Sequence, residues 1–291
     1  MPLRRFMQLD VFADRPMLGN PLAVVIDADG IDDATMQAFA RWTNLSETTF
    51  LLPPTTPQAD YRVRIFTPRQ ELPFAGHPSV GSAYAAIEAG LVDAGKRALV
   101  QECAAGLLPV RVEGDGAARV IHVQAPPARI TALDAALRQG LAAALPAALD
   151  ESGTALVDNG PHWLVCDLRS AAAVRALTPD LAAIAALCQH NAAVGVSVFG
   201  AETDGTAAMA VRAFCPADGI PEDPVTGSAN AAIMAFLAAR GDTRYGLRYR
   251  ASQGREVGRD GLVDVAREEG SGAITIGGAC ALTIRGELAL G

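Results

Sequence analysis

Apolar residues recur along the chain in short continuous runs or in alternation with polar ones, a pattern typical of β-strands. Such runs are spread over the whole sequence and are separated by Gly- and Pro-containing segments. The predicted strands are Met7–Phe12, Ala23–Ile26, Arg62–Phe66, Val110–Val112 and Val120–Val123, then Trp163–Cys166, Val196–Phe199, Met209–Phe214 and Leu262–Val265, and finally Ala273–Ile276 and Leu282–Ile284.

Helical segments are fewer. Ser82–Ala89 and Ser228–Ala239 have helical composition, and each is followed by a glycine suited to the position after a helix end, Gly90 and Gly241. Further helices are predicted within Asp32–Thr43, Pro179–His190 and the Ala- and Leu-rich stretch Ile130–Leu149, which we expect to contain a helix bridging two halves. The fold class is therefore α/β (α+β), mostly β with one or two helices in each half.

An internal repeat organises these elements. The segment FTPRQELP (66–73) resembles FCPADGIP (214–221) at an offset of 148 residues, and PSVGSAYAAI (78–87) resembles PVTGSANAAI (224–233) at 146. A weaker match joins 19–25 to 159–165. The repeat predicts two similar domains at residues 1–127 and 128–279, with the last strand, 280–291, returning to complete the first.

The register between the halves has two solutions. The offset of 146 aligns His77 with Asp223, each in a proline-bounded turn before Gly-Ser. Alternatively, the Ala-Gly-His at 75–77 lies over the Thr-Gly-Ser at 226–228. In the first register both helices begin at Gly-Ser and present free backbone N–H groups, which would bind a carboxylate or phosphate in a cleft between the domains.

Three residues are candidates for proton transfer. Asp223 is held between Pro221 and Pro224, and His77 occupies a similar turn. Glu47, in NLSETTF (44–50), has apolar neighbours, and desolvation there would favour a carboxyl that takes and returns a proton. Each residue also has a plainer interpretation. His77 could be a turn histidine bonded to a backbone carbonyl, and Asp223 an acid that stabilises a helix start. Glu47 could be a solvent-facing loop acid.

Composition narrows the function. The 291-residue chain carries a net charge of −8, which argues against nucleic-acid binding. Five scattered cysteines without C-x-x-C favour a reducing compartment. The histidines lack metal-ligand spacing, and the nucleotide-binding and serine-hydrolase motifs are absent, so we expect no metal or cofactor. No signal peptide or membrane span is evident, and a soluble cytoplasmic protein is expected.

The blocks GNPLAVV (19–25), NLSETTF (44–50), ELPFAGHP (71–78) and EDPVTGSA (222–229) resemble the phenazine-biosynthesis PhzF family over nearly the whole chain. The resemblance implies the diaminopimelate-epimerase fold: two pseudo-symmetric domains, each a β-barrel-like sheet around a central helix, with the active site between them. It also implies cofactor-free isomerisation of trans-2,3-dihydro-3-hydroxyanthranilate, a small carboxylate, by a homodimer.

By this resemblance Glu47 is the catalytic acid/base, and His77 and Asp223 are its polar partners. The substrate carboxylate would be held by Gly76, Gly227 and Ser228, with Asn20 lining the same cleft. Cysteine-dependent racemases of the wider superfamily carry thiols in these turns, where this chain has Ala75 and Thr226. Epimerisation or lyase chemistry on another small carboxylate, or a catalytically silent ligand-binding role, are the alternatives.

Overall fold

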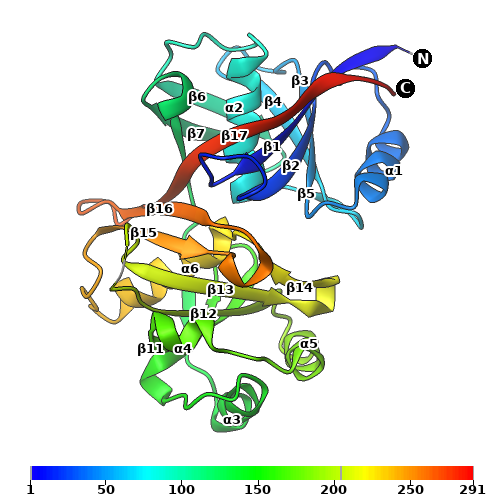
Figure 1. Cartoon of the computed structure of the whole chain (residues 1–291). Coiled ribbons are helices and arrows are strands. Elements are labelled where there is room, and N and C mark those ends of the chain that lie inside the picture. The colour runs from blue at the N-terminus through cyan, green and yellow to red at the C-terminus, as the bar shows by residue number, and fades with distance from the viewer. Residues whose placement is uncertain (1, 204, 291) are drawn as a thin grey trace. The chain divides into compact units, whose positions relative to one another are not determined.

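The computed structural model describes residues 2–203 and 205–290, and the chain divides into two compact units (Figure 1). Unit 1 contains the residues up to Gln124 together with those from Gly277 onward, and unit 2 is Ala125–Ile276. Within the described ranges, no helix is long and apolar enough to cross a membrane.

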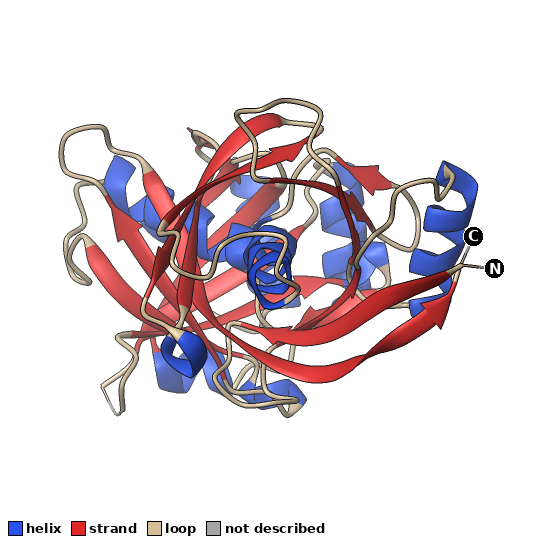
Figure 2. Cartoon of the chain, turned by 90° about the horizontal axis from the view of Figure 1, so that it is seen from above, coloured by secondary structure: helices blue, strands red, loops and turns tan. Residues whose placement is uncertain are grey.

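Unit 1 is a closed barrel around the buried helix α2 (Gly76–Glu88). The last strand of the chain closes it, because β17 pairs with both β1 and β8. Figure 2 views this unit close to the axis of α2, with the strands curving around the helix. The eight described strands of the barrel are β1 (Leu3–Val11), β2 (Asn20–Val25), β3 (Thr48–Leu52), β4 (Tyr61–Phe66), β6 (Ala98–Cys103), β7 (Gly106–Glu113), β8 (Val120–Gln124) and β17 (Ile274–Ala289).

Helix α2 fits inside the barrel because its residues are small. A Cβ on Gly81 would lie 2.5 Å from the Leu22 side chain and 2.8 Å from that of Val11, so only glycine permits this approach. The helix is buried on almost every side, which removes the apolar stripe that marks a surface helix. The remaining elements of unit 1 are α1 (Asp33–Thr43), β5 (Glu71–Leu72) and the 3₁₀ turn Gly116–Ala118.

Unit 2 repeats this plan around helix α6 (Gly227–Ala239), which is also almost entirely buried. Its strands pair in the order β9, β10, β11, β12, β13, β15, β16, and β14 pairs with β13. The strands are β9 (Arg129–Thr131), β10 (Thr154–Asp158), β11 (His162–Ser170), β12 (Gly195–Ala201), β13 (Met209–Cys215), β14 (Ile220–Asp223), β15 (Arg248–Gln253) and β16 (Gly261–Arg267), and the other α-helices are α3 (Ala135–Ala144), α4 (Ala171–Arg175) and α5 (Leu181–His190).

The strand pairing reproduces the internal repeat. The pairs β2–β3 and β4–β6 are parallel in unit 1, as are β11–β12 and β13–β15 in unit 2. Thr48 lies opposite Phe66, and Val196 lies opposite Phe214, so both members of the second pair follow those of the first by 148 residues. The two halves therefore share one topology, and equivalent residues can be read from it.

The register of the helices corrects one sequence-based alignment. Helix α2 begins at Gly76 and α6 at Gly227, an offset of 151, so His77 corresponds to Ser228. The alignment of His77 with Asp223 was wrong, because Asp223 lies opposite Ala213 as Leu72 lies opposite Ile65. The alternative register, with 75–77 over 226–228, is the observed one.

Most predicted elements are present, but the prediction omitted several strands, among them β3, β6, β10 and β15, and gave unit 2 one or two helices where four α-helices are described. The two short strands predicted near the C-terminus belong to one long strand, β17. Two predicted helices also need correction. Helix α2 begins at Gly76 and not at Ser82, because Pro78 falls within the first turn, where its missing N–H has no helical partner to lose. The Gly-Ser at 81–82 is therefore inside the helix and forms no anion site. Helix α3, predicted within Ile130–Leu149, packs in the core of unit 2 and is part of that unit.

Candidate functional site

Among the described residues, each unit contains one α-helix whose N-terminus lacks a side-chain cap. In the other four α-helices of the described chain, a side chain preceding the helix accepts a hydrogen bond from a first-turn N–H. Ala75 and Thr226, at the N-caps of α2 and α6, make no such bond. The first-turn N–H groups of α2 and α6 are thus left for another acceptor, as an anion-binding helix start requires. The capped helices begin after Asp32, Asp134, Ser170 and Asp180.

Glu47 is placed beside the start of α2 by a sharp turn. Helix α1 ends at Asn44, whose left-handed φ of 52° suits asparagine, and β3 begins at Thr48. Glu47 Oε2 lies 3.4 Å from His77 Nδ1, and the two side chains are 16% and 7% exposed. The carboxylate is therefore not a solvent-facing loop acid, the interpretation that composition alone favours.

His77 is the second residue of α2 and is buried at the barrel end. Burial lowers the pKa of His77 to about 3, so the imidazole is neutral at physiological pH. The 3.4 Å approach to Glu47 falls within ion-pair range, yet desolvation decides the protonation state, and the contact is that of a neutral ring beside a carboxyl group. Nε2 of His77 is buried without a hydrogen-bond partner in the described part of the chain.

In unit 2, Asp223 ends β14 and precedes the turn into α6. It is 9% exposed, and its Oδ2 accepts a hydrogen bond of 2.6 Å from Thr226 Oγ1. Asp223 and Glu222 follow one another in a strand, where successive side chains point to opposite faces. Asp223 thus faces the start of α6, whereas Glu222 faces the other way.

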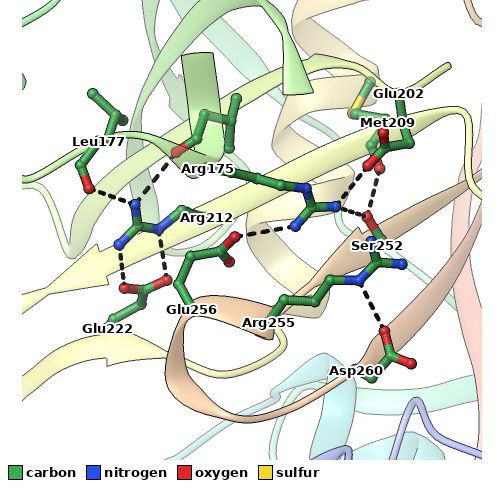
Figure 3. A network of polar contacts seen from close by, with 11 residues as sticks. Arg175, Leu177, Glu202, Met209, Arg212, Glu222, Ser252, Arg255, Glu256 and Asp260 are labelled. Carbon is green, nitrogen blue, oxygen red and sulfur yellow. Dashed lines mark hydrogen bonds and ion pairs between the residues drawn. The ribbon is translucent and has the colours of Figure 1, made fainter. Parts of the chain in front are cut away.

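Glu222 has a structural partner, Arg212 of β13 (Figure 3). The guanidinium donates two hydrogen bonds of 2.9 and 2.8 Å to the carboxylate, and its Nη1 also donates to the carbonyl of Leu177. In unit 1 the equivalent pair, Arg64 and Glu71, makes the same two-pronged contact. The acid next to Asp223 therefore anchors the short β14 strand to β13.

Ser228 occupies in α6 the position that His77 has in α2. Its hydroxyl accepts a hydrogen bond of 3.2 Å from the indole N–H of Trp163, and its carbonyl accepts one of 2.9 Å from Asn159. An indole N–H only donates, so the hydroxyl proton of Ser228 is left to be given to another acceptor. Sequence reasoning missed Trp163, because its indole is brought to Ser228 only by the pairing of distant strands.

Gly195 explains how Trp163 reaches Ser228. Gly195 lies opposite Trp163 in the β11–β12 pair, and a Cβ at position 195 would lie 2.8 Å from the Trp163 ring. Gly195 is the residue equivalent to Glu47, since each immediately precedes the strand residue opposite a repeated phenylalanine. At this position unit 1 has an acid beside His77, whereas unit 2 has a glycine that admits an indole to Ser228.

The remaining predicted site residues lie at strand and helix starts. Asn20 is fully buried as the first residue of β2, opposite Val11 of β1. Gly76 and Gly227 are the first residues of α2 and α6. The structure thus groups Glu47, His77 and Gly76 in unit 1, and Asp223, Gly227 and Ser228 in unit 2.

The cysteines lie outside both helix-start turns. Burial raises the pKa of Cys166 and Cys280 to about 12 and that of Cys188 to about 11, which keeps these thiols protonated. Cys215 is the last residue of β13 and Cys103 the last of β6. In the described residues, no cluster of three or more His, Cys, Asp or Glu side chains could hold a metal ion.

Comparison with known proteins identifies close relatives. "Antisense-enhancing sequence 1" of Schizosaccharomyces pombe is 36% identical over 97% of each chain. The "Trans-2,3-dihydro-3-hydroxyanthranilate isomerase" of Pseudomonas aeruginosa is 37% identical over 93% of this chain and 92% of its own.

Solved structures of similar proteins also match this chain over almost its whole length. A PhzF-family protein of Bacillus anthracis superposes with a TM-score of 0.85 at 26% identity, covering 99% of this chain and 100% of its own. A predicted epimerase of P. aeruginosa gives a TM-score of 0.81 at 31% identity, over 98% of this chain and 99% of its own. A probable proline racemase of Agrobacterium radiobacter, with a TM-score of 0.69 at 17% identity, shares the fold, covering 99% of this chain and 93% of its own. These neighbours confirm the diaminopimelate-epimerase-like fold class.

Several relatives are named isomerases and one structural neighbour is a predicted epimerase, and the chain is an enzyme of this isomerase- and epimerase-like kind. A family model described as "Phenazine biosynthesis-like protein", PhzC-PhzF, matches residues 9–286, almost the whole sequence. The chain therefore belongs to the PhzC-PhzF family.

Proposed function

We propose that this protein is a cofactor-independent isomerase that moves a proton on a small cyclic amino- or hydroxy-carboxylate. The proposed substrate is trans-2,3-dihydro-3-hydroxyanthranilate, the compound in the name of several relatives. Glu47 is the general acid/base, with His77 and Asp223 as its polar partners. Gly76, Gly227 and Ser228 bind the substrate, together with Asn20, which belongs to GNPLAVV (19–25), another of the blocks that resemble the family.

The observation that carries the proposal is the pairing of Glu47 with a neutral histidine at an uncapped helix start. Glu47 lies 3.4 Å from His77, whose ring is held neutral by burial. A neutral imidazole can accept or donate a hydrogen bond, and His77 Nε2 has no such partner within the described residues. The first turn of α2 supplies backbone donors next to this pair.

The proposed proton transfer by Glu47 needs no co-reactant. Glu47 accepts a proton from an acidified C–H bond of the substrate and returns a proton to another carbon of the same molecule. The composition of substrate and product is therefore the same, as an isomerisation requires. The hydroxyl of Ser228, whose oxygen accepts from Trp163, donates its proton to the substrate carboxylate.

A homodimer in the cytoplasm, acting in phenazine biosynthesis, completes the proposal. The family resemblance supports the dimer and the pathway, and the scattered cysteines favour a reducing compartment. Light scattering on the purified protein tests the assembly, since a homodimer has twice the 30.1 kDa mass of one chain. A monomeric mass at working concentration would contradict the proposed dimer and leave the chemistry to be judged separately.

Turnover of the proposed substrate tests the function. Purified wild-type protein is incubated with trans-2,3-dihydro-3-hydroxyanthranilate, and loss of the compound is followed by liquid chromatography. Glu47→Gln should slow conversion by about 10³-fold or more, because an amide cannot accept the proton. Glu113→Gln, the same change on exposed strand β7, is the control and should retain the wild-type rate. No conversion by the wild type would refute the substrate, and conversion by Glu47→Gln would refute the acid/base assignment.

A further inference from the structure

The side-chain amide of Gln253 is fixed in one orientation by two backbone groups. Gln253 ends β15 and is 1% exposed. Its Oε1 accepts a hydrogen bond of 3.0 Å from the N–H of Thr226, and its Nε2 donates one of 3.0 Å to the carbonyl of Asp223. Reversing the amide would set donor against donor and acceptor against acceptor, so the assignment follows from the backbone alone.

The fixed amide determines the direction of the next hydrogen bond. Nε2 of Gln253 also donates to Thr226 Oγ1 at 2.8 Å, and Thr226 Oγ1 lies 2.6 Å from Asp223 Oδ2. In the described part of the chain, Asp223 Oδ2 is the one acceptor within hydrogen-bond distance of this hydroxyl. The hydroxyl proton of Thr226 therefore points to Oδ2.

We propose that Gln253 and Thr226 are positioning residues that hold the Thr226 hydroxyl as a donor to Oδ2 of Asp223 and so fix the carboxylate in the orientation in which it meets the substrate. This inference rests on the proposed function, in which Asp223 is a polar partner of the reaction.

The turn between Asp223 and α6 lacks the ordinary helix cap that its threonine could provide. An N-cap threonine normally accepts a bond from a first-turn N–H, whereas the hydroxyl of Thr226 makes no such bond. Asn230, fully buried one turn into α6, donates to the carbonyl of Thr226 at 2.8 Å and to Gln253 Oε1 at 3.1 Å. Three neutral side chains thus fix the turn that carries one carboxyl group.

Unit 1 has a buried glutamine that bonds its own helix α2, but it has no acid at the place of Asp223. Gln101, in β6 of unit 1, donates from Nε2 to Ser79 Oγ at 2.9 Å and accepts from Tyr61 OH at 3.1 Å. The residue equivalent to Asp223 is Leu72, as the strand pairing shows. The strand pairing aligns Gln101 with Ala251 and not with Gln253, because Tyr61 lies opposite Gln101 as Met209 lies opposite Ala251. The link from glutamine through threonine to an acid is therefore particular to unit 2.

Steady-state kinetics with trans-2,3-dihydro-3-hydroxyanthranilate tests the proposal. Thr226→Val keeps the shape and removes the hydroxyl, and it should lower kcat at least tenfold with KM changed less than threefold. Thr226→Ser restores the hydroxyl and should return kcat to within threefold of the wild type. Thr154→Val is the matched control, because it removes a buried hydroxyl of the same unit that donates to a backbone carbonyl. It should leave kcat unchanged.

A double-mutant cycle separates action through Asp223 from a general loss of order. In an Asp223→Asn background, Thr226→Val should lower kcat no further, because the group on which it acts is gone. A kcat for Thr226→Val within twofold of the wild type would overturn the proposal, and so would a full additional loss in the Asp223→Asn background.

Failure of the proposed function gives a different result. If the wild type does not convert the compound, the substrate assignment fails, and the same cycle is measured by urea unfolding. Shifts in the unfolding midpoint that are not additive for Thr226→Val and Asp223→Asn would uphold the coupling of Thr226 to Asp223 through their hydrogen bond. Additive shifts would overturn it.

Discussion

Protonation of His77 should be visible as a pH dependence of stability. Burial lowers the pKa of His77 to about 3 in the folded protein, against an ordinary value of about 6.5 in the unfolded chain. Because the folded-state pKa is depressed, this contribution to stability is fully present above pH 6.5 and is lost as pH falls toward 3. Between pH 7 and pH 5 the unfolded chain binds almost one proton at this ring and the folded protein binds almost none.

The expected size follows from these two values. From pH 7 to pH 5 the free energy of unfolding should fall by about 2 kcal/mol through His77 alone. Because pH 5 lies well above the folded-state pKa, this figure depends almost entirely on the unfolded chain. His77→Gln removes the titrating ring and should show a fall smaller by that amount.

Urea unfolding of wild type and His77→Gln at a series of pH values between 5 and 7 measures the difference. The other histidines are present in both proteins, so their contributions cancel in the subtraction. Parallel curves for the two proteins would refute the reasoning. They would mean that the folded protein protonates His77 as readily as the unfolded chain does, as an ion pair with Glu47 would allow.

Three further substitutions test the packing around the unit 2 residues. Trp163→Phe keeps an aromatic ring and removes the N–H that bonds Ser228, so KM for the proposed substrate should rise about threefold to tenfold. Trp42→Phe, on the surface, is the control and should leave KM unchanged. An unaltered KM for Trp163→Phe would contradict the anchoring of Ser228. Gly195→Ala should lower the unfolding free energy measured in urea by about 1–3 kcal/mol or more, because the new Cβ would lie 2.5 Å from the carbonyl oxygen of Phe214. Gly286→Ala is the control: its Cβ meets no atom, and the cost should be less than about 1 kcal/mol. Equal costs would argue against the close fit at Gly195. Glu222→Gln leaves the buried Arg212 with a neutral partner and should lower the unfolding free energy by about 3 kcal/mol, and a change under about 0.5 kcal/mol would show that the pair does not anchor β14.

The fold could be predicted from sequence because both of its signals are local. Runs of apolar residues located most of the long strands, although β3, β6, β10 and β15 were not predicted. The repeated F-x-P and Gly-Ser blocks indicated two similar halves. The start of α2 was misplaced because Gly81-Ser82 imitates the Gly227-Ser228 of the other half. A buried helix has no amphipathic stripe to set its limits, and Pro78 within the first turn reads as a break.

The candidate site was only partly accessible to sequence reasoning. Glu47, His77 and Asp223 stand in unusual turns and could be named from the chain alone. Trp163 and Gln253 sit in strands remote from α6 in sequence, and only the pairing of strands brings their polar groups to its first turn. The halves also differ through a glycine, Gly195, whose role is to leave space, and a pattern of residue types does not reveal such a role.

The most direct test of Glu47 as the acid/base is a proton NMR assay in D₂O with trans-2,3-dihydro-3-hydroxyanthranilate. If Glu47 takes the substrate proton and returns one that has exchanged with solvent, the wild-type product should carry deuterium at the newly protonated carbon. The spectrum of the compound with Glu47→Gln should stay unchanged over the same period. Deuterium uptake at the wild-type rate in Glu47→Gln would contradict the central claim and assign the proton transfer to another group.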